Sequence, residues 1–161
     1  CAADLTMGTL AETDSATMQR VLAVNVVAPA MLAQRVAPGM AQRGFGRIVN
    51  IASDTFDRPP APGFVPYVTA KGALIGLTRA LAVELGPSGI TVNAISPGLT
   101  LTPASRAQVP EAAFEQVVGA QVLKRSLVPS DYEALLALLV SPEGEAITGQ
   151  NIRADAGLIM V

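Results

Sequence analysis

The sequence predicts an α/β fold built on a doubly wound parallel sheet, and two observations carry that prediction. Three short runs rich in apolar and β-branched residues are each bounded by Gly or Pro, which is typical of strands. Helical patterns precede these runs and separate them. Strands that alternate with helices are joined by right-handed crossovers into a parallel sheet. We therefore expect a single α/β domain over residues 1–161.

The expected elements follow one another in a regular order. Strands are expected at 47–52, 91–95 and 150–154, and helices at 14–43, 67–85, 111–123 and 130–140. The first helical stretch is predicted to be two helices that meet between Asn25 and Pro29. A sheet of three strands leaves an unpaired edge and an apolar face in water. We therefore expect the isolated chain to aggregate or to need a partner.

The composition excludes several classes of function. Half of the residues are hydrophobic and 15% are charged, which indicates a globular chain. The net charge is −2 and the 11 basic residues are scattered, so we expect no nucleic-acid partner. No apolar run approaches the roughly 20 residues of a membrane span, so we expect a cytoplasmic protein. One Cys and no His exclude an internal disulfide, the usual zinc sites and a histidine-based triad, and we expect no metal.

Tyr67 and Lys71 are the candidate acid/base pair. They lie four residues apart in a helical pattern, which places phenol and ammonium on one face of the helix. The ordinary pKa of tyrosine is about 10, and a nearby lysine cation favours the phenolate and lowers that pKa. Such a tyrosine can act as a general acid or base. The alternative is an ordinary surface pair at helical spacing.

Polar residues follow the first two expected strands. Ser53 comes directly after the strand at 47–52, where its hydroxyl could hydrogen-bond a substrate oxygen, although a serine there is usually a turn former. Pro97 and Gly98 follow the second strand, and Thr102 nearby could hold a ligand amide. Because the carboxyl ends of parallel strands share one edge of the sheet, we expect these segments to meet there.

Together with Asn25, a polar residue inside an apolar helical stretch, these residues resemble the short-chain dehydrogenase/reductase family in order and approximate spacing. The resemblance extends through 46–51, 76–81, 90–98 and 147–150. It implies a Rossmann-like fold, of which these 161 residues hold only the C-terminal strands and their helices. The family's opening strand and its Gly-rich turn, which receives the pyrophosphate, are not among them.

The resemblance also implies a role for each catalytic candidate. Tyr67 would exchange a proton with the reacting oxygen, while Lys71 would lower the pKa of Tyr67 and bind the nicotinamide ribose. Ser53 would orient and polarise the carbonyl. Asn25 would hold a water molecule that links Lys71 to solvent.

A second set of residues would contact the cofactor, which the resemblance identifies as NAD or NADP without a choice between them. The turn after the second strand would hold the nicotinamide, with Thr102 bonded to its carboxamide. Ala2 and Ala3 stand where the family has an Asn-Asn-Ala-Gly stretch. The expected cofactor-binding residues are therefore Ala2, Ala3, Tyr67, Lys71, Pro97, Gly98, Leu99 and Thr102.

The leading hypothesis is an enzyme that interconverts an alcohol and a ketone or aldehyde, with the 161 residues inactive on their own. A segment at 109–122 is expected to cover the site, and Phe114, Val117, Val118 and Val122 within it indicate an apolar substrate. Family members are commonly dimers or tetramers packed through the helices at 25–43 and 67–85. The alternative hypothesis is an inactive fragment or family member that acts only through protein association.

Overall fold

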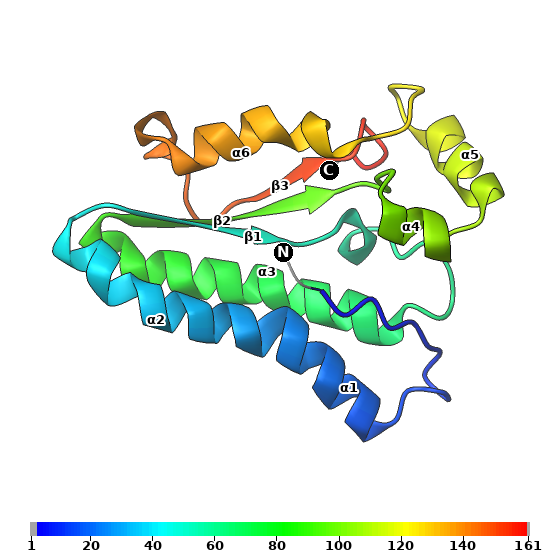
Figure 1. Cartoon of the computed structure of the whole chain (residues 1–161), viewed down its shortest axis with the longest axis horizontal. Helices are drawn as coiled ribbons and strands as arrows, with labels where there is room; N and C mark the ends of the chain where they lie inside the picture. Colours follow the sequence, from blue (N-terminus) through cyan, green and yellow to red (C-terminus); the bar gives the residue numbers. More distant parts are fainter. Residues whose placement is uncertain (1–2, 161) are drawn as a thin grey trace.

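The computed structural model describes residues 3–160 as three layers, with one parallel sheet between two layers of helices. The sheet has the order β1-β2-β3, formed by Gly46–Ile51, Ile90–Pro97 and Asn151–Ala154. Helices α1, α2 and α3 lie on one side of the sheet and α6 lies on the other (Figure 1). Both neighbouring strand pairs are parallel. The predicted α/β fold is therefore confirmed.

The first long helix is continuous but contains one irregular turn. Its parts are α1 (Ser15–Leu22), a π-helical turn (Ala23–Val27) and α2 (Ala28–Gln42). The Asp14 side chain caps α1 by accepting a hydrogen bond from the Thr17 amide. Pro29 has no N–H to donate to the Asn25 carbonyl, and the chain accommodates this with the π-turn. The predicted break into two helices is therefore wrong, although the irregularity lies where it was expected.

The continuity of this helix changes one expectation about membranes. By length and composition alone, the helix Ser15–Gln42 is long and apolar enough to cross a bilayer. The expectation that no apolar stretch approaches that length is therefore wrong, because the π-turn joins two shorter segments into one helix. On its own this is weak evidence, since buried core helices and signal sequences meet the same criterion.

Strand β2 is the centre of the fold, and all of its residues except Pro97 are buried. Its side chains Ile90 and Val92 pack with Ala37 of α2 and Ala82 of α3 in the main hydrophobic cluster. The outer edge of β1 pairs with no strand in the part of the chain that the structure describes. The expected small sheet with an unpaired edge is therefore present.

The remaining helices follow β1 and β2 in the chain. Helix α3 (Val65–Leu85) follows β1 with Pro66 in its first turn, a position where the missing proline N–H costs nothing. After β2 come α4 (Pro103–Gln108), α5 (Glu111–Ala120) and α6 (Glu133–Val140). Of these, α4 and α5 lie beyond the carboxyl ends of the strands (Figure 1). Short 3-10 turns cover Asp54–Phe56, Gly86–Ser88, Pro129–Tyr132 and Pro142–Gly144.

Helix α4 is an element that the sequence did not predict. Thr102 accepts a hydrogen bond from the Ser105 amide at 3.1 Å, and the Ser105 hydroxyl accepts one from the Thr102 amide at 2.9 Å. This reciprocal arrangement is a capping box, with Pro103 in the first turn of the helix. The six residues of α4 were too few to show a helical pattern of their own.

Candidate active site

The carboxyl end of β1 and the start of α3 bring three candidate catalytic residues together. Ser53 follows β1, is 7% exposed and caps the turn Asp54–Phe56. Lys71 is 4% exposed, and its ammonium donates a hydrogen bond to the Ile51 carbonyl at 2.7 Å. The Lys71 nitrogen lies 5.5 Å from the centre of the Tyr67 ring. The surface-pair alternative does not describe Lys71, because its side chain is buried against the strand end.

The electrostatics of the pair differ from the sequence expectation. Burial lowers the pKa of Lys71 to about 8. Burial also raises the pKa of Tyr67, the Ser53 hydroxyl lowers it, and the negative charge of Asp54 raises it. The expectation that Lys71 lowers the pKa of Tyr67 is therefore wrong for this structure. The reason is that desolvation of the phenolate dominates, while the Lys71 ammonium is directed to a backbone carbonyl.

Asn25 lies in the π-turn and is 3% exposed. Its side-chain nitrogen donates to the Asp4 carbonyl at 2.9 Å and to the Val21 carbonyl at 3.0 Å. Its side-chain oxygen is buried without a hydrogen-bond partner in the described structure. Asn25 therefore links the N-terminal segment to the helix through hydrogen bonds. Its side-chain oxygen is an open buried acceptor, which suits a bound water.

The turn after β2 is packed tightly against the end of β3. The Gly98 amide donates to the Ala154 carbonyl at 3.2 Å, and the Leu101 amide donates to the Leu127 carbonyl at 2.8 Å. Between residues 3 and 160, no hydrogen-bond acceptor is found for the amides of Leu99 and Thr100. Free backbone donors of this kind suit the carboxamide oxygen of a nicotinamide, so the donor set of this turn fits the cofactor.

The residues expected to bind the cofactor lie in different parts of the structure. The Thr102 hydroxyl is already engaged with Ser105 in the capping box of α4. Ala3 lines a cavity beside the N-terminal segment. Ala2 lies outside the described residues. The structure thus places Pro97, Gly98, Leu99 and Thr102 at one turn and Ala3 on a separate segment.

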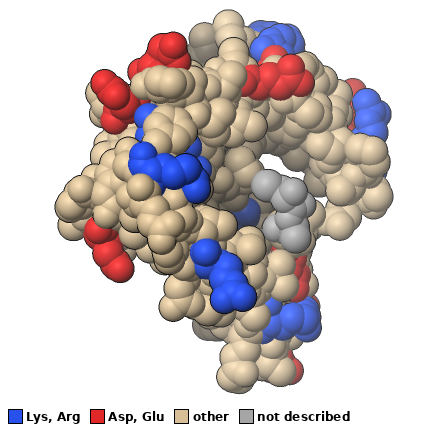
Figure 2. Space-filling model, turned by 60° about the vertical axis from the view of Figure 1, so that its left-hand side comes forward, with Lys and Arg blue, Asp and Glu red and all other residues tan. Residues whose placement is uncertain are grey.

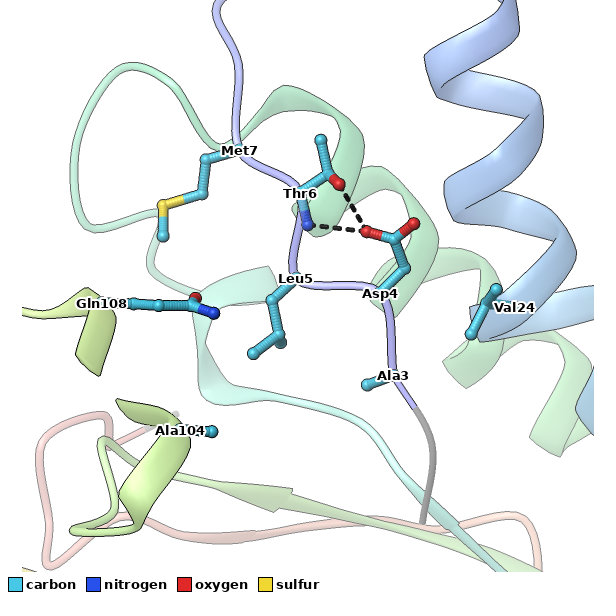
Figure 3. A pocket seen from close by; sticks show the side chains of 8 residues that line it. All are labelled: Ala3, Asp4, Leu5, Thr6, Met7, Val24, Ala104 and Gln108. Carbon is cyan, nitrogen blue, oxygen red and sulfur yellow. Dashed lines mark hydrogen bonds between the residues drawn. The ribbon is translucent and has the colours of Figure 1, made fainter. Parts of the chain in front are cut away.

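An open cavity of about 920 Å³ lies between the N-terminal segment and α4 (Figure 3). Asp4 and Thr6 face it from the segment and are hydrogen-bonded to each other, and Ala104 and Gln108 line it from α4. The rest of the lining is apolar, from Leu5, Met7 and Val24 with Ala3. Ser53, Tyr67 and Lys71 are not among its lining residues, so this cavity is distinct from the catalytic candidates.

The apolar residues expected in the cover at 109–122 differ in their exposure. The side chain of Phe114 is buried, while Val122 is 59% exposed and lies against Gly157. None of the four apolar residues expected in the cover lines the cavity, whose walls mix polar and apolar groups. The side chain of Phe114 therefore packs into the fold, and the apolar substrate stays a prediction.

Charged side chains are dispersed over the face of the molecule that Figure 2 shows. The face in Figure 2 shows Lys and Arg interspersed with Asp and Glu. Among residues 3–160, no group of three or more Cys, Asp or Glu side chains is placed to hold a metal ion.

Asp54 is a site residue that the sequence reasoning missed. It follows Ser53 directly and is 6% exposed. Burial raises the pKa of Asp54 to about 7, and the nearby charge of Asp155 acts in the same direction. The available signal was an acidic residue beside a strand-end serine, but burial of that carboxyl depends on packing that the sequence alone does not reveal.

Gly98 provides a structural prediction at this site. A Cβ on Gly98 would lie 2.9 Å from a Leu127 methyl carbon and 3.0 Å from the Asp155 Cα, so Gly98→Ala is expected to destabilise the protein by about 1–3 kcal/mol. Gly76→Ala is the matched control, because a Cβ there meets nothing within 4 Å. It is expected to stabilise α3 by about 0.5–1 kcal/mol. Urea unfolding measures both, and equal effects would contradict the tight turn.

Comparison with known proteins agrees with this geometry. A family model described as enoyl-(acyl carrier protein) reductase matches residues 1–159. Dehydrogenase/reductase SDR family member 4 from Pongo abelii is 36% identical over 151 residues, which cover 93% of this chain and 54% of that protein. The chain belongs to the short-chain dehydrogenase/reductase family. It spans about half the length of the curated relatives it matches.

Two further members of the family show its range. A D-xylose 1-dehydrogenase from Caulobacter vibrioides is 39% identical over 124 residues, which cover 77% of this chain and 50% of that protein. The structure of a 4-hydroxyisoleucine dehydrogenase mutant complexed with NADH and succinate matches with a TM-score of 0.88 at 32% identity. The match covers 98% of this chain and 65% of that one.

Proposed function

We propose that this chain forms the proton-transfer part of a NAD- or NADP-dependent oxidoreductase that interconverts an alcohol and a ketone or aldehyde. One observation carries the proposal: at the end of β1, Ser53 lies within hydrogen-bond reach of Tyr67, and the buried Lys71 lies close to the Tyr67 ring. A hydroxyl, a phenol and an ammonium at one strand end can bind and protonate a carbonyl oxygen. The family relationship supports the same reaction type.

Each residue has a distinct task in this proposal. The Ser53 hydroxyl hydrogen-bonds the reacting oxygen and orients it. The Tyr67 phenol gives a proton to that oxygen in reduction and removes one from it in oxidation. Lys71 would donate a hydrogen bond to the cofactor ribose, and Asn25 would offer its open acceptor to a water molecule. The nicotinamide, when bound, supplies or accepts the hydride at the substrate carbon.

The cofactor would lie along the carboxyl edge of the sheet. The amides of Leu99 and Thr100 would hold the carboxamide, and Thr102 would join them by exchanging a hydrogen bond with Ser105 for one with the ligand. The choice between NAD and NADP stays open, because the residues that make it in the family lie in the segment that binds the adenosine half.

Turnover of the full-length protein tests this function. The proposal predicts reduction of NAD⁺ or NADP⁺, followed by absorbance of the reduced nicotinamide, with a hydroxylated substrate. D-xylose and 4-hydroxyisoleucine are suitable first substrates, since relatives are named for them. Failure of the full-length protein to bind either cofactor would instead favour a member that acts only through association.

We also propose that a second copy of the protein packs on α2 and α3. Apolar side chains of these helices are exposed, with Leu32 at 66% and Val83 at 81%, which is typical of an interaction surface. Leu32→Asp is therefore expected to reduce the full-length protein from a dimer or tetramer to a smaller species in light scattering. Leu10→Asp is the control, because Leu10 is 79% exposed but lies in a loop. A monomeric parent protein would contradict this proposal.

A further inference from the structure

Thr100 lies in the turn after β2, and its side chain makes hydrogen bonds that the proposed mechanism does not use. The Thr100 hydroxyl donates to the Gly98 carbonyl at 2.8 Å. The phenolic oxygen of Tyr132 lies 2.6 Å from the same hydroxyl. A hydroxyl has one proton and a carbonyl can only accept, so the proton of Thr100 goes to Gly98 and the Tyr132 phenol donates to Thr100. The proton of the Thr100 hydroxyl is therefore committed to the backbone of the turn.

The backbone on either side of this hydrogen bond is anchored to other parts of the fold. The Gly98 amide donates to the Ala154 carbonyl at the end of β3, at 3.2 Å. The Thr100 carbonyl accepts a hydrogen bond from the Ser105 hydroxyl of α4 at 2.6 Å. Between these anchors lies the peptide group that joins Gly98 to Leu99. In the described part of the chain, the hydrogen bond found for this peptide group is the one from the Thr100 hydroxyl.

That hydrogen bond determines which way the Leu99 amide faces. The described peptide bonds are all trans, and the C=O and N–H of a planar trans peptide point in opposite directions. While the Gly98 carbonyl is held by the Thr100 hydroxyl, the Leu99 N–H is therefore directed away from that hydroxyl. The Leu99 amide has no acceptor among residues 3–160. Its donor is thus both oriented and open to a ligand.

We propose that Thr100 is a positioning residue, whose hydroxyl holds the Gly98–Leu99 peptide in the orientation that offers the Leu99 amide to the nicotinamide carboxamide. The inference rests on the proposed function, in which the amides of Leu99 and Thr100 hold that carboxamide. It adds a side chain that touches neither substrate nor cofactor and acts through the backbone of the turn.

Removal of the hydroxyl is expected to weaken the binding of the nicotinamide. In Thr100→Val the side chain keeps its branched shape, but the Gly98 carbonyl loses its hydrogen bond. The peptide group can then adopt other orientations, and binding must order it at a cost in affinity. The affinity for the nicotinamide cofactor is expected to fall about 3–10-fold, the range that one hydrogen bond supplies.

Calorimetric titration of the full-length protein with two probes tests the proposal without any turnover. The first probe is NADH or NADPH, whichever the parent protein binds. The second is the matching ADP-ribose, with or without the 2′-phosphate, which lacks the nicotinamide. In Thr100→Val the first probe is expected to bind about 3–10-fold more weakly, while the affinity for the second stays within about twofold. A merely structural disturbance would change both affinities or neither.

Two variants are the controls. Thr100→Ser keeps the hydroxyl and is expected to bind both probes as the parent does. Tyr132→Phe removes the other hydrogen bond of the Thr100 hydroxyl but leaves the one to Gly98. It is expected to lose stability without a selective loss of affinity for the nicotinamide probe. Thr100→Ala provides the same comparison as Thr100→Val if the valine variant does not fold.

The outcomes separate this inference from the proposed function. Equal changes in the two affinities in Thr100→Val, no change in either, or a serine variant as weak as the valine variant would overturn the positioning role while the proposed function stands. A parent protein that binds neither NADH nor NADPH would overturn the proposed function, and this inference with it.

Discussion

Tyr67→Phe in the full-length protein is expected to lower kcat for the oxidation of a hydroxylated substrate by about 10²–10⁴-fold, the usual loss when a general acid or base is removed. The phenylalanine ring keeps the packing of the first turn of α3 but has no proton to exchange. Cofactor affinity is expected to change by less than about tenfold, because at most one hydrogen bond is lost. Initial rates of reduced nicotinamide formation and cofactor binding by fluorescence measure the two effects separately.

The matched control for this substitution is Tyr132→Phe. Tyr132 is the other tyrosine of the chain, and its hydroxyl is hydrogen-bonded to Thr100 at 2.6 Å. Loss of that bond is expected to cost about 1 kcal/mol of stability. The kcat is expected to stay within about threefold of the parent value, since no proton transfer depends on the Tyr132 hydroxyl. A Tyr67→Phe protein that retained most of its turnover would remove the acid/base assignment.

Asp54→Asn is expected to stabilise the full-length protein above pH 7 and to have little effect near pH 4. The pKa of Asp54 rises from 3.8 to about 7 on folding, so the folded state binds the proton more tightly than the unfolded state. Stability from this group is therefore present below pH 4 and is lost as the pH rises to about 7. A rise of this size in the pKa of Asp54 lowers the free energy of unfolding by about 2–4 kcal/mol at most. An uncharged asparagine avoids this loss.

Urea unfolding of parent and variant at pH 5 and pH 8 measures this difference. The gain in stability from Asp54→Asn is expected to be larger at pH 8 than at pH 5. The same difference in stability at both pH values would show that the Asp54 carboxyl does not change its charge in this range. Titrating groups that do not interact with Asp54 contribute equally to both proteins and cancel in the comparison.

Much of the fold followed from local patterns. The three strands occur at the expected places, because apolar runs bounded by Gly or Pro have few alternatives. The π-turn formed where a break between two helices was predicted, since Pro29 disrupts hydrogen bonding within a helix but packing against α3 keeps the axis continuous. Helix α4 was missed because its stability comes from a capping box and not from an apolar periodicity.

The candidate site was predicted less completely than the fold. Helical spacing paired Tyr67 with Lys71, the end of a predicted strand singled out Ser53, and the family resemblance joined the three. The structure has Lys71 bonded to the end of β1 and close to the Tyr67 ring. The direction of the pKa shifts could not be predicted, because burial decides it and burial belongs to the tertiary structure. The same reason hid Asp54, whose importance comes from its desolvation and from its distance to neighbouring charges. Phe114 was expected to cover the site, but its side chain is buried in the core. Its apolar character alone could not distinguish the two positions.

The most direct test of the central claim is the fate of the hydrogen on the reacting carbon. The full-length protein is supplied with NAD⁺ or NADP⁺ and with D-xylose carrying deuterium at C1, and the nicotinamide product is analysed by NMR. Hydride transfer predicts that the deuterium appears at C4 of the reduced nicotinamide in the parent protein and that Tyr67→Phe slows its appearance. If D-xylose is not a substrate, 4-hydroxyisoleucine deuterated at C4 replaces it. Deuterium released into water, or no transfer from either substrate by a protein that binds neither cofactor, would contradict the account.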